Sequence, residues 1–249
     1  MSEVLRGFVP TDEADFSVQQ AERLFLAQEE ICYLLDRGYQ IEKIVTFVGN
    51  HYQFTARQRL ALTRASSSSQ DVKNRKSRQI SGPLKGRTVY IDGFNLIITL
   101  EAALSHSPLL LCMDGTIRDL CGLHGTYRLI DKTQTALSLI WEALAERKVG
   151  KAIFYLDAPV SNSGRLKQEI LRTGGERGIP VEAETVPNAD ALLWDKDGVV
   201  TTDAIILNRC QGWVNLAAEI VQGKLAGQKI VNLSKTSSNT AMDRITFGK

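Results

Sequence analysis

From residue 87 onward, short apolar runs alternate with stretches of helical period. The runs lie at 88–92, 109–112, 151–157, 180–186, 199–203 and 229–233. Helical spacing occupies 95–104, 131–148, 163–173, 190–194 and 213–222. Strands that alternate with helices are typical of an α/β fold whose parallel sheet is covered by helices. The pattern therefore predicts an α/β domain over 88–249, with a parallel sheet in a three-layer arrangement.

The first 65 residues carry only helical signals. Apolar residues over 19–37 recur three or four positions apart, and Gly38 is a suitable C-cap. A second short helix is expected over 41–48, and a third over 55–65 begins with a capping-box sequence. These signals predict a small all-α region at 1–65. Its short helices also loosely resemble a helix-turn-helix DNA reader, and a docked helical accessory is the alternative.

Basic residues concentrate between these two regions. Residues 51–88 hold nine basic residues and one acidic residue, whereas 1–50 hold nine acidic and four basic residues. The serine run at 66–69 indicates a flexible joint, so 66–87 is interpreted as a basic linker. Phosphate contacts from Lys and Arg supply most of the non-specific affinity of nucleic-acid binders, and a solvated basic linker is the alternative. The candidate nucleic-acid-binding residues here are Arg57, Arg59, Arg64, Lys73, Arg75, Lys76 and Arg78.

Three further arginines extend this set. Arg118 and Arg128 lie in or just beyond the glycine-containing segment 114–127, which has no clear period and suits a substrate-binding loop. Arg165 follows Ser-Asn-Ser-Gly at the start of a helix, where backbone N–H groups can hold a phosphate. Solvated loop charges and ordinary helix capping explain these positions equally well.

Composition limits the classes of protein. The chain has 249 residues, of which 43% are hydrophobic and 23% charged, as in an ordinary globular protein. No apolar run reaches the length of a membrane span, and the N-terminus lacks a secretion signal. The four cysteines form no Cys-x-x-Cys pair, which excludes a zinc-finger spacing and a disulfide framework. A cytoplasmic protein without a membrane association is expected.

Four of the apolar runs each lead to an aspartate. These are Asp92, Asp157, Asp190 and Asp203. The carboxyl ends of parallel strands meet at one edge of a sheet, where ligands bind. Crowded carboxylates raise one another's pKa unless a divalent cation neutralises them, and oxygen ligands favour Mg²⁺ or Mn²⁺ over zinc. Such a metal activates water and stabilises the charge of phosphodiester displacement, so metal-assisted phosphodiester hydrolysis is the chemistry indicated.

The same residues have a structural alternative. An Asp or Asn directly after a strand is a good helix N-cap, because its side-chain oxygen accepts from an unpaired backbone N–H. Asp92, Asn95, Asp157 and Asp203 all suit caps or turns. Their equivalent positions after separate strands favour a site over four independent caps.

Three stretches resemble motifs of a known nuclease class. Residues 89–96, VYIDGFNL, resemble the first motif of PIN-like and NYN nuclease domains. Residues 188–193, NADALL, and 199–203, VVTTD, resemble their later acidic motifs. With LLDRGY at 34–39 and DAPVSNSGR at 157–165, the chain also resembles an uncharacterised prokaryotic family that joins a helical N-terminal region to a PIN-like domain.

The resemblance implies a Mg²⁺- or Mn²⁺-dependent ribonuclease. Asp92, Asp190 and Asp203 match metal-binding and catalytic positions, Asn95 matches a supporting catalytic one, and Asp157 is a further metal candidate. NYN domains usually carry a second aspartate two residues after the last motif's aspartate. Here that position is Ile205, and Glu101 is either its substitute or an exposed helix residue.

We therefore expect an endoribonuclease that acts on structured or single-stranded RNA. The loss of one acid leaves a non-catalytic RNA-binding module as the first alternative, and a DNA-binding regulator that uses the N-terminal helices is the second. The RNA substrate, the cleavage position and the number of metals are open. So is the oligomeric state, which includes a homo-oligomer.

Overall fold

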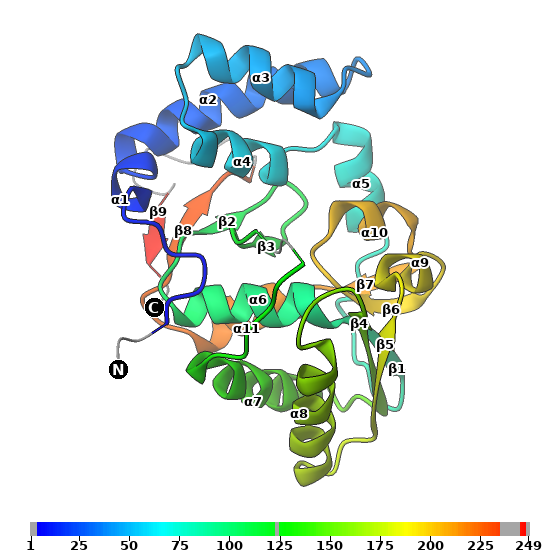
Figure 1. The fold of residues 1–249 in the computed structure, drawn as a ribbon. Coiled ribbons are helices and arrows are strands. Elements are labelled where there is room, and N and C mark those ends of the chain that lie inside the picture. The colour runs from blue at the N-terminus through cyan, green and yellow to red at the C-terminus, as the bar shows by residue number, and fades with distance from the viewer. Residues whose placement is uncertain (1–3, 123–124, 235–244, 248–249) are drawn as a thin grey trace.

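A five-stranded parallel sheet forms the centre of the α/β part. The computed structural model describes residues 4–122, 125–234 and 245–247 (Figure 1). The strand order is β5-β4-β1-β6-β7, and every neighbouring pair is parallel. Chain order therefore reverses between β1 and β6, which makes this the topological switch point of the sheet. The bounds are β1 Thr88–Asp92, β4 Lys151–Asp157, β5 Val181–Val186, β6 Asp197–Val200 and β7 Gly212–Val214.

Helices cover both faces of this sheet. On one face, Ile91, Phe154 and other strand side chains share a buried core with α6 Gly93–Leu104, α7 Asp131–Glu146, α8 Ser163–Glu176 and α11 Leu216–Lys224. On the other face, Tyr155 and Val199 pack with α9 Ala189–Leu193 and α10 Ala204–Arg209. Successive strand side chains point to opposite faces, so one apolar run supplies both cores. The predicted α/β fold with a parallel sheet is confirmed.

A second sheet, which the sequence does not predict, lies against the N-terminal helices (Figure 1). Its order is β3-β2-β8-β9, with β2 Leu109–Leu111, β3 Ile117–Arg118, β8 Lys229–Asn232 and β9 Ile245–Phe247. The strand expected at 229–233 forms as β8, but it pairs in parallel with β2 and is not part of the main sheet.

The three predicted N-terminal helices are present. They are α2 Val18–Leu35, α3 Ile41–His51 and α4 Ala56–Ala65, preceded by the short α1 Asp12–Asp15. The capping box of α4 forms as expected, because the Thr55 side chain accepts from the Gln58 N–H while the Gln58 side chain accepts from the Thr55 N–H. Buried residues of α2 and α4 share a core with β2 and β8. The helical region therefore packs directly on the second sheet.

In place of the flexible joint expected at the serine run, the structure has helix α5, Ser69–Ser77. The Ser68 hydroxyl caps this helix by accepting from the Asp71 N–H at 3.1 Å. Arg75 is buried, and the chain then bonds to the edge of the main sheet through Ile80 N–H and the Trp213 carbonyl, 2.7 Å. Across the described ranges, no helix is both long and apolar enough to cross a membrane.

Candidate carboxylate site at the sheet edge

Asp92 is a buried carboxylate at the carboxyl end of the central strand. One of its oxygens accepts from the backbone N–H of Asn95 at 3.3 Å and caps α6, and the other accepts from the Thr201 hydroxyl at 2.9 Å. Gly93 makes this turn feasible, because a Cβ there would lie 2.6 Å from the Leu156 side chain and 3.2 Å from the Tyr155 carbonyl. The helix can therefore begin directly against β4.

Asn95 joins the end of β1 to the end of β6. Its Oδ1 accepts from the Thr202 backbone N–H at 2.8 Å and from the Thr202 hydroxyl at 3.1 Å. Asp203 follows at once and caps α10, since one oxygen accepts from the backbone N–H groups of Ile205 and Ile206. Asp92, Asn95 and Asp203 are thus held at the switch point, where sheets of this kind bind ligands.

The remaining two aspartates lie on the β4 and β5 side of this edge. Asp157 ends β4 and accepts from the backbone N–H of Ala189 at 2.9 Å, which fixes the start of α9. Asp190 is the second residue of α9 and is half-buried. The N-cap interpretation is therefore correct for Asp92 and Asp203, whereas Asp157 positions a helix start from a neighbouring strand.

The four carboxylates influence one another electrostatically. Burial, followed by the charges of Asp203 and Asp190, raises the pKa of Asp92 to about 7 against the opposing hydrogen bonds from Thr201 and the Asn95 backbone N–H. Burial also raises the pKa of Asp190, with contributions from Asp203 and Asp157. Like charges held together without a cation favour protonation. The structure thus brings the four predicted aspartates to one edge, and their catalytic and metal-binding roles stay predictions.

The donor set suits a hydrated divalent ion better than a closed cage. Among the residues that the structure describes, no three His, Cys, Asp or Glu side chains are arranged as a ready-made metal-binding group. Mg²⁺ usually keeps several waters and uses only one or two carboxylates, so it does not need such a cage. Aspartate and asparagine oxygens are the type of ligand it prefers.

Glu101 does not replace the acid missing at position 205. It is completely buried in α6, where Arg6 forms an ion pair with it at 2.9 Å and Tyr127 donates a hydrogen bond at 2.7 Å. Burial raises its pKa against these partners. Both expectations for Glu101 are therefore wrong, because it is neither exposed nor part of the sheet edge.

Most of the predicted RNA-binding arginines bond inside the molecule. Arg57 pairs with Asp12 at 2.8 Å and also donates to the carbonyls of Gly7 and Leu120. Arg75 and Arg118 are buried, so the expectation that they contact RNA is wrong. The predicted arginines whose guanidinium donors are used in this way are Arg57, Arg59, Arg64, Arg75, Arg78 and Arg118.

The other four predicted residues remain available to a ligand. The side chains of Lys73, Lys76, Arg128 and Arg165 are exposed and make no hydrogen bond or ion pair with the described part of the chain. Their role in binding RNA stays a prediction. Fewer of the predicted residues can therefore contribute to a positive surface than the composition of the segment indicates.

A second charged cluster, which the sequence does not reveal, lies beside the carboxylate site. Asp114 is buried between Arg75 at 2.8 Å and Arg118 at 2.7 Å. Burial would raise the pKa of Asp114, but Arg118, Thr116 and Arg75 outweigh it and hold the pKa at about 2. Arg118 Nε also donates to the Thr202 carbonyl at 2.7 Å. This cluster therefore supports the loop that carries Asp203.

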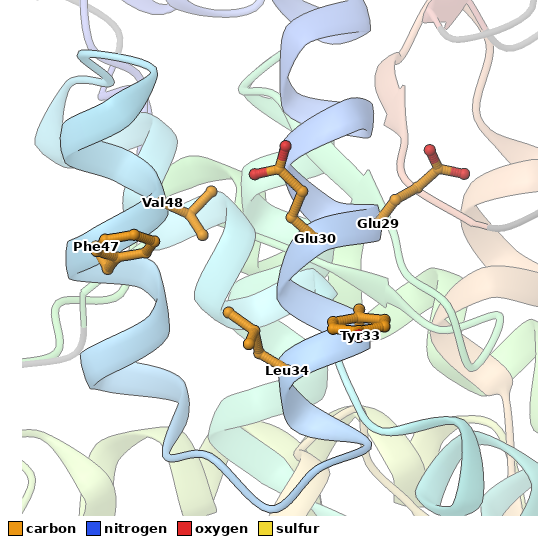
Figure 2. A pocket seen from close by; sticks show the side chains of 6 residues that line it. All are labelled: Glu29, Glu30, Tyr33, Leu34, Phe47 and Val48. Carbon is orange, nitrogen blue, oxygen red and sulfur yellow. The ribbon is translucent and has the colours of Figure 1, made fainter.

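The N-terminal helices present an apolar groove with acidic residues. The groove lies between α2 and α3, has a volume of about 390 Å³ and is lined by Glu29, Glu30, Tyr33, Leu34, Phe47 and Val48 (Figure 2). Phe47 is 71% exposed. Carboxylates repel phosphates, so this face does not suit a nucleic-acid backbone.

Comparison with known proteins places this architecture in a family. Residues 81–219 match a domain of unknown function, DUF5616, and residues 23–78 match a protein of unknown function, DUF434. No solved structure matches the chain. An uncharacterized protein of Methanocaldococcus jannaschii, MJ0935, is 36% identical over 200 residues, which cover 79% of this chain and 95% of that protein. The match over 81–219 spans more than half of the chain and includes all four aspartates, and the chain therefore belongs to the DUF5616 family.

Proposed function

We propose that the protein is a metal-dependent endoribonuclease with a PIN-like or NYN-like α/β domain. The observation that supports this most is the presence of four aspartates along one edge of a parallel sheet, two of them at its switch point, with burial and like charge raising the pKa of Asp92 and Asp190. Titratable groups perturbed in this way are typical of functional sites. The motif resemblance of residues 89–96 and 199–203 supplies the reaction class.

Each polar residue of the edge has a role in this proposal. Bound Mg²⁺ or Mn²⁺ would lower the pKa of a water and stabilise the charge that develops on the phosphate. Asp92, Asp190 and Asp203 would hold the ion, with Asp157 as a further ligand. Asn95 fixes Thr202 and so holds the ends of β1 and β6 together, while Thr201 orients Asp92. Because metal must displace a proton from Asp92, affinity for the ion rises with pH.

A non-catalytic RNA-binding protein is the second candidate. The observation that favours it is Ile205, which is 56% exposed where NYN domains usually carry another acid. A site with one carboxylate fewer has less charge with which to bind a cation. The DNA-binding alternative has weaker support, because the apolar groove between α2 and α3 carries Glu29 and Glu30 and no basic residue in its lining, and the arginines of α4 bond within the molecule.

We place this activity in the cytoplasm. The four cysteines are free thiols, and three of them are buried. Unpaired thiols suit a reducing compartment, where disulfides are rare.

Cleavage of end-labelled RNA, single-stranded and structured, tests the proposal. Wild-type protein with Mn²⁺ or Mg²⁺ is expected to cut, and Asp92→Asn is expected to lose at least about 100-fold in rate, because one charge that holds the ion is gone. Asp131→Asn, at the exposed start of α7, is the matched control and keeps full activity. If wild type binds RNA but cuts none under either metal, the second candidate replaces the first.

A further inference from the structure

A surface formed by α9 and α10 pairs two aromatic rings with two cations. The Arg209 guanidinium lies 4.0 Å from the centre of the Trp194 ring, and the Lys196 ammonium lies 4.9 Å from the centre of the Tyr90 ring. Arg209 is exposed, and Trp194 and Lys196 are half-buried. Arginine and aromatic faces in combination are what proteins use to stack the bases of single-stranded nucleic acids.

This surface adjoins the carboxylate site. Asp203 caps α10, and Ile205 and Arg209 follow on one face of that helix, four residues apart. The six-residue step from Asp203 to Arg209 corresponds to about 9 Å along the helix axis. Leu193 of α9 and Ile206 of α10 share a buried cluster, which holds the two helices together.

Two exposed apolar side chains lie close in sequence to the acids, on the two helices that carry Trp194 and Arg209. Leu192 in α9 is 41% exposed and Ile205 in α10 is 56% exposed. Each lies within two residues of one of the site's aspartates, Asp190 or Asp203. Apolar groups at this place can contact a base while the carboxylates act on the backbone next to it.

Helix α5 lies beside α10 (Figure 1). It is tied to α10 because Arg75 donates to the Asn208 side chain at 2.7 Å and Arg78 donates to the Cys210 carbonyl at 2.7 Å. Its exposed lysines are Lys73 and Lys76. Nearby acids are Asp195, which is exposed, and Asp197, which pairs with Arg87. The free lysines are therefore available for phosphate contacts.

We propose that single-stranded RNA lies across α5, α10 and α9, with a base stacked on the Trp194–Arg209 pair and its backbone leading to Asp203. A duplex hides its base faces within the stack, so an aromatic platform selects unpaired nucleotides. The role of the adjoining acids rests on the proposed function. The platform itself needs no metal, and binding can be measured without cleavage.

Tryptophan fluorescence reports on this surface. The other two tryptophans, Trp141 and Trp213, are buried, so a base that stacks from solvent quenches Trp194. We expect an oligouridylate of roughly 12 nucleotides, titrated in EDTA, to quench the emission. Trp194→Phe loses the quenching but binds within a few-fold of wild type, because a ring remains.

Substitutions then measure the contribution of the platform. Trp194→Ala is expected to weaken binding about 5- to 100-fold, the range for loss of one stacked base. Since Trp194 also packs against the core, Arg209→Gln supplies an exposed variant, with an expected loss of about 3- to 10-fold. Arg172→Gln on α8 is the matched control, and its affinity is expected to stay unchanged.

Several results would overturn this assignment. Binding without quenching and without an effect of Arg209→Gln would place the RNA elsewhere, as would equal or tighter binding of a blunt RNA hairpin. Tighter binding of the deoxy oligonucleotide would overturn the assignment to RNA. The two proposals fail separately: quenching by RNA that is never cut refutes the nuclease alone, and cutting that is unaffected by Arg209→Gln refutes the platform alone.

Discussion

Two charged clusters lie on either side of Thr202, and they differ in whether cations of the same chain neutralise their aspartates. The Thr202 backbone N–H and hydroxyl donate to Asn95 at the carboxylate site, while its carbonyl accepts from Arg118 of the second cluster. Asp114 has two guanidiniums of its own chain and a depressed pKa. Asp92 is buried among acids, and its pKa is raised to about 7.

Asp114 is thus neutralised within the fold, and we propose that Asp92 is neutralised by a bound cation. An aspartate that pairs with arginines of the same chain is neutralised when the chain folds. Removing it leaves those buried arginines without a partner. Burial and neighbouring carboxylates favour the protonated form of an aspartate such as Asp92, unless a cation neutralises it.

The largest effect on stability is expected at Asp114, whose charge is neutralised by Arg75 and Arg118. Asp114→Ala leaves Arg75 and Arg118 buried without their carboxylate, so the free energy of unfolding is expected to fall by about 3–5 kcal/mol. Urea denaturation measures this, and Asp131→Asn serves as an exposed control. A loss under about 1 kcal/mol would mean that the cluster does not hold the fold.

The carboxylate site is expected to make the protein less stable as pH rises, whereas a salt-bridged acid makes a protein more stable as pH rises. Asp92 titrates at 3.8 when unfolded and about 7 when folded, so its contribution is complete below pH 4 and is lost as pH rises through 7. The change is about 4 kcal/mol at most. Asp92→Asn is expected to make the denaturation midpoint depend less on pH between pH 4 and 8. An equally steep slope in the variant would assign the dependence to other groups.

Arg57 tests whether an internally bonded arginine also binds RNA. Arg57→Gln removes the ion pair with Asp12 and the bond to Gly7, so unfolding free energy is expected to fall by about 1–3 kcal/mol with RNA affinity unchanged. Denaturation and filter binding on the same preparation give both numbers. Weaker RNA binding by a fully folded variant would restore the original interpretation of this residue.

The smallest effect is expected from the exposed lysines of α5. Replacing Lys73 and Lys76 by Gln is expected to leave stability unchanged and to reduce the slope of log affinity against log salt by about 1.4, at about 0.7 for each phosphate contact on a single strand. An unchanged slope would show that RNA does not reach α5.

The sequence predicts the ends of β1, β4 and β5 well because a short apolar run and the polar residue after it are local features, whereas β6 ends at Val200 and not at the expected 203. Parallel topology then brings Asp92, Asp157 and Asp203 to one edge without further information. The second sheet could not be predicted in this way. Leu110 pairs with Val231 across more than a hundred residues, and β3 has only two residues.

The basic segment shows why composition does not predict a charged surface. Ser69–Ser77 has no apolar periodicity, and its helix depends on a serine cap and on burial of Arg75 against Asp114. Whether an arginine side chain is exposed to solvent or donates a hydrogen bond to a carbonyl depends on residues far away in the chain. Arg64, for example, donates to the carbonyls of Asp119 and Cys121.

Titration of Mn²⁺ followed by electron paramagnetic resonance tests most directly whether the carboxylate edge is a metal site. Wild type at pH 8 is expected to bind Mn²⁺, with affinity that falls as pH drops below 7 and Asp92 takes up its proton. Asp92→Asn is expected to weaken binding at least about 10-fold, and Asp131→Asn to leave it unchanged. Mn²⁺ affinity that is the same in wild type and Asp92→Asn would contradict the account.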